Sequence, residues 1–154
     1  MITYTTENKD IVLELTSKTT IFSKDRIICN IVFKNNIGTV LANIKFPDYE
    51  LINLIDNIYA FLYISDNIMY TLKSYNDING RIYSIGLSSE YTMRYNGDTY
   101  TRRYLSLYSY QDDMMIKILS FEVTNTLDEL TDLLYEFFIE NNLSDEIKKE
   151  VLNL

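Results

Sequence analysis

Residues 81–110, RIYSIGLSSEYTMRYNGDTYTRRYLSLYSY, decide the fold class. Two long runs rich in Ile, Tyr, Leu and Thr flank a single Asn-Gly, which is typical of two antiparallel strands joined by a hairpin turn. A two-residue turn would set Leu87 opposite Ser106, although opposed residues share one face of a sheet. We therefore predict a three-residue loop, Asn96 to Asp98, or an equivalent bulge, which pairs Leu87 with Leu107.

Further strands are expected on both sides of this hairpin. Runs of β-branched and aromatic residues between turn signals predict them over residues 11–15, 26–34, 37–46, 67–75 and 114–123. Asn35-Asn36 predicts a tight turn between the second and third of these runs. The strands after residue 67 are joined only by short turns, which predicts an antiparallel meander.

Two helices are expected from capping signals and apolar periodicity. The first opens at Pro47-Asp48 with Asp48 as its cap, and its buried stripe comprises Leu51, Leu54, Ile55, Ile58, Phe61 and Leu62. Glu50, Asn53, Asp56 and Asn57 are expected to face water. The second helix begins with a capping box of Thr126 and Glu129, and its buried side comprises Leu127, Leu130, Leu134, Phe137 and Phe138. A short third helix is expected after Ser144.

The order of these elements predicts an α+β fold. We expect one antiparallel sheet of about seven strands, in the order βββ-α-ββββ-α-α, with the helices packed on one face. The chain has 154 residues and no Pro/Gly/Ser linker or internal sequence repeat. A single domain over residues 1–154 is therefore expected.

The composition excludes several classes of enzyme. The chain has no histidine, which rules out Ser-His-Asp and Cys-His catalysis and histidine-bound zinc. Its four glycines do not have the spacing of a phosphate-binding loop. We interpret Asp112-Asp113 as a solvated turn rather than a metal site, because hard cations need more ligands than one acidic pair supplies. We expect a protein that is not an enzyme and needs no cofactor or metal.

The compartment is predicted from cysteine usage and from the N-terminus. The single cysteine, Cys29, lies in an apolar run and is interpreted as a core residue. No signal peptide and no apolar run of about 20 residues is present. We therefore predict a cytoplasmic protein with no membrane partner.

The hairpin supplies the first candidate binding surface. In the predicted register its outward face carries Arg94, Tyr100, Arg102 and Tyr104, whereas Tyr91 and Arg103 lie on the other face near the tip. Tyr and Arg are enriched in the energetic centres of interfaces, because each buries a large area and keeps a polar end. The partner-binding residues predicted here are Arg94, Tyr95, Tyr100, Arg102, Arg103 and Tyr104. Cross-strand tyrosine pairs that merely stabilise a half-exposed sheet remain an alternative.

The C-terminal part supplies the second candidate surface. The net charge is −8, and residues 121–154 hold nine acids and only two lysines. Asp128, Asp132, Glu136 and Glu140 follow one another at intervals of four, which aligns them on one helical face. This face is either simply solvated or a stripe that binds the basic groove of another protein.

Three functions stay open for these surfaces. The abundance of Ile, Asn, Lys and Tyr follows A/T-rich codons, which predicts a low-GC bacterium or its phage and weakens any argument from tyrosine content alone. In size, acidity and element order the whole chain resembles bacterial toxin-immunity proteins and phage-encoded inhibitors of host defence, a resemblance that assigns no site residues. The leading hypothesis is a stoichiometric inhibitor that binds another protein. The alternatives are a single-stranded nucleic-acid binder and a phage or mobile-element assembly protein that forms a homodimer or larger homo-oligomer.

Overall fold

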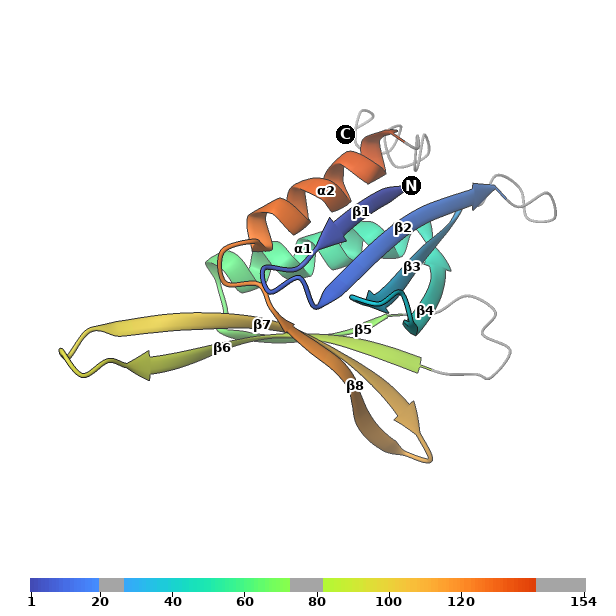
Figure 1. The fold of residues 1–154 in the computed structure, drawn as a ribbon. Helices are drawn as coiled ribbons and strands as arrows, with labels where there is room; N and C mark the ends of the chain where they lie inside the picture. The colour runs from blue at the N-terminus through green and yellow to red at the C-terminus, as the bar shows by residue number, and fades with distance from the viewer. Residues whose placement is uncertain (20–26, 73–81, 141–154) are drawn as a thin grey trace.

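The computed structural model describes residues 1–19, 27–72 and 82–140. These residues form eight strands and two helices, which confirms the predicted α+β class (Figure 1). In chain order the elements are β1 (Ile2–Thr5), β2 (Ile11–Thr19), β3 (Ile27–Asn35), β4 (Val40–Pro47), α1 (Asp48–Tyr63), β5 (Asn67–Leu72), β6 (Ile82–Met93), β7 (Thr99–Gln111), β8 (Met114–Glu122) and α2 (Leu127–Glu140). The helix predicted after Ser144 lies outside the described residues.

The strands form two four-stranded sheets, so the prediction of one sheet of about seven strands was wrong. Strands β1 to β4 make the first sheet and β5 to β8 the second, and each strand pairs antiparallel with its neighbour in sequence. Turn signals identify hairpins, but they do not show whether two strands separated by a helix share a ladder. The pattern ββββα therefore occurs twice along the chain, a structural repetition that the sequence does not display.

Strand β1 was missed in the sequence. It pairs with β2, with Tyr4 opposite Leu13. The side chain of Tyr4 is only 1% exposed, and its hydroxyl lies 2.6 Å from Oγ1 of Thr126, just before α2. The first residues of the chain thus belong to the core and join the sheet to the second helix.

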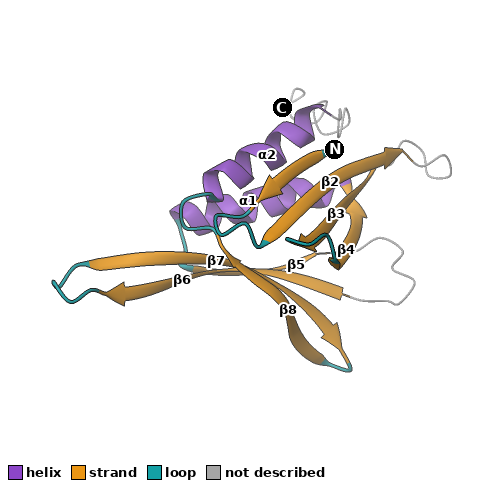
Figure 2. Cartoon of the chain, in the orientation of Figure 1, coloured by secondary structure: helices purple, strands orange, loops and turns teal. Residues whose placement is uncertain are grey.

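Both helices lie on the same face of the first sheet (Figure 2). The side chains on that face are buried, namely Leu13, Leu15, Cys29, Ile31, Phe33, Ala42, Ile44 and Phe46. The opposite face carries polar residues such as Glu14 and Lys34, which form an ion pair of 3.0 Å between Oε2 and Nζ. This alternation is what a sheet with one face packed and one face solvated requires.

The buried stripe predicted for α1 is confirmed for Leu51, Leu54, Ile55, Ile58 and Phe61. Two details of the prediction were wrong. The N-cap is Pro47 rather than Asp48, which is already helical. Glu50 is buried, with 2% of its surface exposed, and the hydroxyl of Tyr70 on β5 donates a hydrogen bond to its Oε2. The reason is positional: Glu50 precedes Leu54 by four residues and Ile58 by eight, so it lies on the apolar stripe itself.

The buried side predicted for α2 is confirmed for Leu127, Leu130, Leu134 and Phe137, while Phe138 is partly buried. The hydroxyl of Thr126, predicted to cap this helix, pairs with Tyr4. Thr131, inside the helix, is also buried and donates to the carbonyl of Leu127 at 2.7 Å. The helix is therefore anchored by its apolar side and by contacts near its start.

The second sheet joins the same hydrophobic cluster through one of its faces. Its buried residues there are Tyr83, Ile85, Leu87, Leu105, Leu107, Leu119 and Phe121. A gap of about 10 Å³ lies where the two sheets and both helices meet, and its walls are apolar, among them Leu13, Ile58, Leu105 and Leu134. A site of this size and polarity holds no more than one water and offers it no partner. The gap is therefore a packing feature and not a ligand site.

Candidate functional site

The β6–β7 hairpin turns through three residues, Tyr95 to Gly97. The N–H of Gly97 donates to the carbonyl of Arg94 at 3.0 Å, and the N–H of Arg94 donates to the carbonyl of Asp98 at 2.7 Å. Gly97 has a φ of 86°, a left-handed conformation that glycine adopts without a steric penalty. The loop has the predicted length but begins one residue earlier than Asn96, because the glycine and not Asp98 supplies its left-handed position.

This shift of the loop changes the pairing but not the faces. Leu87 pairs with Leu105 instead of the predicted Leu107, and Glu90 pairs with Arg102. The pairing is displaced by two residues along one strand, and side chains alternate with a period of two. The residues predicted to share each face therefore still do so.

The tip half of this hairpin extends beyond the rest of the molecule. In Figure 1 the hairpin leaves the helices and the first sheet and continues as a two-stranded ribbon. We call residues 90–104 the projecting hairpin. The pairing of β5 with β6 reaches no further than Ser88, and that of β8 with β7 reaches only Tyr104 at the base of the ribbon. Beyond this base neither of these two described strands extends the sheet.

One face of the projecting hairpin is cationic. The guanidinium carbon of Arg94 lies 4.7 Å from the ring centroid of Tyr100, and that of Arg102 lies 5.2 Å from the same centroid. A side-chain hydrogen bond with Tyr104, followed by the electrostatic effect of Tyr100, raises the pKa of Arg102. We call Arg94, Tyr100 and Arg102 the cationic face; the structure thus brings together three predicted site residues, with Tyr104 beside them.

The other face of the projecting hairpin is open, and its large exposed side chains lie beside two threonines, with Arg103 at the base of the same face. Tyr91 is 63% exposed and Met93 is 74% exposed, although both continue the alternation of the buried residues Ile85 and Leu87. A hydrogen bond with Asp66 raises the pKa of Tyr91. We call Tyr91 and Met93 the apolar face, and Tyr95 in the adjoining turn is fully exposed. The sequence analysis did not place Tyr91 and Met93 among the binding residues. The pattern that identifies them is the alternation of apolar residues in β6, which continues beyond the residues that pack in the core.

Arg103 is separated from the other two arginines. Its side chain is half-buried, and its guanidinium carbon lies 5.9 Å from the ring centroid of Phe61 in α1. Its N–H donates to Oγ1 of Thr124 at 3.0 Å, and its carbonyl accepts from the N–H of Val123 at 2.8 Å. Arg103 therefore fixes the base of the projecting hairpin to α1 and to the segment before α2.

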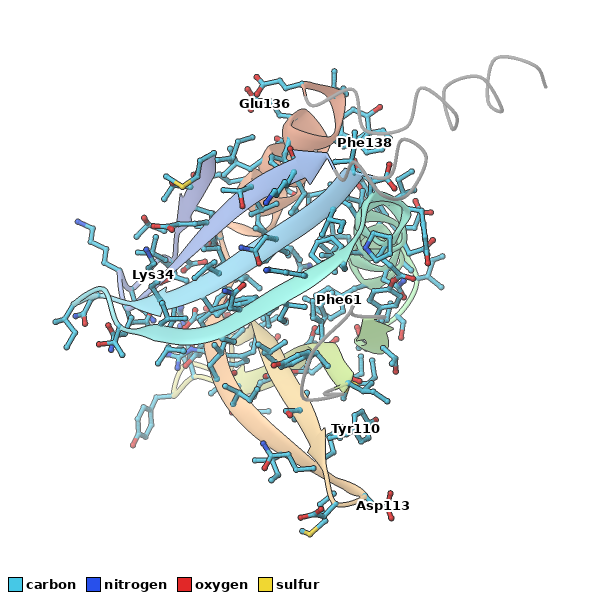
Figure 3. All side chains as sticks on the ribbon, turned by 90° about the vertical axis from the view of Figure 1, so that its right-hand side faces the viewer. Lys34, Phe61, Tyr110, Asp113, Glu136 and Phe138 are labelled. Carbon is cyan, nitrogen blue, oxygen red and sulfur yellow. The ribbon has the colours of Figure 1, made fainter. Side chains whose placement is uncertain are left out.

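The acidic helix face consists of Asp128, Asp132, Glu136 and Glu140, and all four side chains are exposed. In Figure 3 the side chain of Glu136 lies at one end of the molecule, and Asp113 in the β7–β8 turn lies at the opposite end. The helix starts beside the base of the projecting hairpin and runs away from its tip (Figure 1). The two predicted surfaces are therefore separate, and one can be altered without the other.

The remaining acidic groups and Cys29 form no metal site among the described residues. Within these residues no three Cys, Asp or Glu side chains are grouped to hold a metal ion. Asp112 and Asp113 form the β7–β8 turn, with φ angles of 49° and 63°. Burial, and secondarily the charge of Asp48, raises the pKa of Cys29 to about 12, so this thiol stays protonated and unreactive at neutral pH.

Comparisons of the chain with protein-family models, with curated proteins and with solved structures found no match. Neither of the two described helices combines the length and apolar character needed to cross a lipid bilayer. The functional interpretation therefore depends on the surfaces described above.

Proposed function

We propose that this protein acts in the cytoplasm by binding another protein through the projecting hairpin and neutralising that partner in a stoichiometric complex. The observation that carries the proposal is that large side chains are exposed on a two-stranded ribbon that extends beyond the hydrophobic core. Tyr91, Met93 and Tyr95 are 63%, 74% and 113% exposed. Clustered exposed aromatic and apolar side chains of this kind mark interaction sites, because a solitary folded chain gains nothing from them.

The energetics of a hairpin support this interpretation. A two-stranded ribbon without a third strand or a covering helix is marginally stable in water. The projecting hairpin nevertheless keeps a regular ladder from the pair of Glu90 and Arg102 to the pair of Met93 and Thr99. Tyr100 with two guanidiniums above it stiffens the ribbon, since each cation–π contact at an exposed site contributes about 0.5–1 kcal/mol. A stiff, preformed hairpin loses less conformational entropy on binding than a flexible loop.

The acidic helix face is the second candidate contact for the same function. Its carboxylates are solvated and evenly spaced, as they also are on an ordinary exposed helix. The acidic helix face is therefore weaker support for partner binding than the hairpin is. Combined charge reversal at Asp132, Glu136 and Glu140 separates the two surfaces. Unchanged affinity for the partner in that variant excludes the helix.

Affinity capture of the partner tests the proposal. The full chain is immobilised and exposed at low salt to lysate of the source cell, beside a variant with Tyr91→Ser, Met93→Ser and Tyr95→Ser. We expect a protein that the wild type retains and the hairpin variant loses. The proposal fails if no protein is retained, or if the hairpin variant retains the same protein equally well.

Single-stranded nucleic acid remains the second candidate, and one observation favours it. Tyr100, Tyr104 and Tyr108 recur every four residues along β7 and are partly exposed on the face of the second sheet turned away from the core, a position from which aromatic rings can stack bases. The ring of Tyr100, however, already has guanidiniums over it, and the net charge of −8 opposes a polyanion. A mobility shift of labelled single-stranded DNA or RNA at low salt would support this candidate.

A homodimer through the same open face is tested by light scattering at high concentration, where a monomeric mass excludes it.

A further inference from the structure

The two faces of the projecting hairpin differ in chemistry, and this difference identifies the kind of partner they fit. The cationic face presents Arg94 and Arg102, whose side chains are exposed. The apolar face presents Tyr91 and Met93 on the opposite side of the same two strands. A partner that contacts only one side leaves the other exposed, so a cleft that encloses the ribbon buries the most surface.

The arginines are available for an external anion. In the described part of the chain the ion pair found is that of Lys34 with Glu14, and neither Arg94 nor Arg102 has a carboxylate within 4.0 Å. Glu90 stands opposite Arg102 in the ladder without forming such a pair. A guanidinium that enters an interface needs a carboxylate or phosphate to compensate its lost hydration.

The apolar face decides between these two anions. A single strand would have to place its phosphates against Arg94 and Arg102 on one side of the ribbon and its bases against Tyr91 and Met93 on the other, whereas a protein cleft can offer carboxylates on one wall and apolar side chains on the other. The arginines are also held against Tyr100, which leaves less of that ring for a stacked base.

We infer that the partner is a protein whose binding cleft has one acidic wall, which pairs with Arg94 and Arg102, and one apolar wall, which receives Tyr91 and Met93. This inference rests on the proposed function and specifies its partner. It also separates the hairpin from the acidic helix face, which would suit a basic partner instead. Insertion of the hairpin into such a cleft blocks the cleft, which is how a stoichiometric inhibitor acts.

A selection from a random displayed-peptide library tests the inference. The full chain and the variant Arg94→Gln/Arg102→Gln are used as separate baits, with Lys18→Gln/Lys45→Gln as a control of equal charge change on the first sheet. We expect peptides enriched on the wild type to combine Asp or Glu with large apolar residues and to bind the arginine variant at least about 10-fold more weakly. The control variant should bind them like the wild type.

Two sets of outcomes overturn the inference, and only the second set also overturns the proposed function. The acidic wall is refuted if the enriched peptides bind the hairpin without an excess of acidic residues, or if the arginine variant selects the same acidic peptides. It is also refuted if a thymidine oligonucleotide displaces the peptides more strongly than a glutamate-rich peptide does. Absence of any enriched peptide also counts against it. The proposed function itself fails if the peptides bind the triple serine hairpin variant unchanged and lose affinity only when Asp132, Glu136 and Glu140 are reversed.

Discussion

Replacement of Tyr70 by Phe removes the hydroxyl that donates to the buried carboxylate of Glu50. Glu50 is 2% exposed, so water cannot replace the lost donor. Loss of one donor to a buried acceptor costs about 1–3 kcal/mol, and we take about 2 kcal/mol as the expected loss. For a protein of this size that corresponds to a decrease of about 4–8 °C in Tm.

The assay is urea unfolding followed by far-UV circular dichroism, because the chain has no tryptophan and the substitution alters tyrosine fluorescence. Tyr59→Phe is the matched control, since Tyr59 is 41% exposed on the same helix as Glu50 and its hydroxyl can remain solvated. The control should change the free energy of unfolding by less than about 0.5 kcal/mol. Equal effects of the two substitutions would refute the idea that Glu50 depends on Tyr70 inside the core.

Three further predictions concern the turns and the buried thiol. Gly97→Ala should destabilise the protein by about 1 kcal/mol, because alanine is strained at a φ of 86°; an unchanged urea midpoint would contradict the turn described here. Asp113→Gly should stabilise it by up to about 1 kcal/mol, because glycine relieves the left-handed strain at a φ of 63°, and the same unfolding experiment checks this. Folding raises the pKa of Cys29 from 9.0 to about 12. Above pH 9 the unfolded state loses the thiol proton while the folded state keeps it, so the free energy of unfolding decreases as the pH rises from 9 towards 12. The decline over that range should be smaller in Cys29→Ala, and the native thiol should react with a disulfide reagent at pH 8 only as fast as the protein unfolds.

Much of the fold follows from local patterns. The period-two alternation around Ile85, Leu87, Leu105 and Leu107 predicts both strands and their buried face, and the helical stripe from Leu51 to Phe61 predicts the face of α1 that packs. These predictions were correct because each depends on the spacing of side chains within one element. The division into two sheets depends on how α1 carries the chain from β4 to β5, which no local spacing encodes.

Glu50 shows where residue type misleads. Its charge predicts exposure, but its spacing from Leu54 and Ile58 predicts burial, and the structure follows the spacing because Tyr70 supplies a donor from another element. A donor that comes from a strand 20 residues away cannot be recognised in a single sequence.

The candidate site was predictable in part. The contact between Arg94 and Tyr100 follows from the hairpin, although Thr92 is the residue opposite Tyr100. The separation of Arg103 from Arg94 and Arg102 follows from the alternation of faces. The open apolar face was not predictable, because the exposure of Tyr91 and Met93 depends on where the helices and the neighbouring strands end. Whether any of these residues bind a partner stays a prediction.

The most direct test of the central claim is a calorimetric titration of the captured partner into three proteins. These are the wild type, the triple serine hairpin variant at Tyr91, Met93 and Tyr95, and the variant with Asp132, Glu136 and Glu140 each changed to Lys. We predict a single stoichiometric site on the wild type, a loss of affinity of at least about 100-fold in the hairpin variant, and little change in the helix variant. A hairpin variant that unfolds at the wild-type urea concentration and still binds the partner with wild-type affinity would contradict the claim.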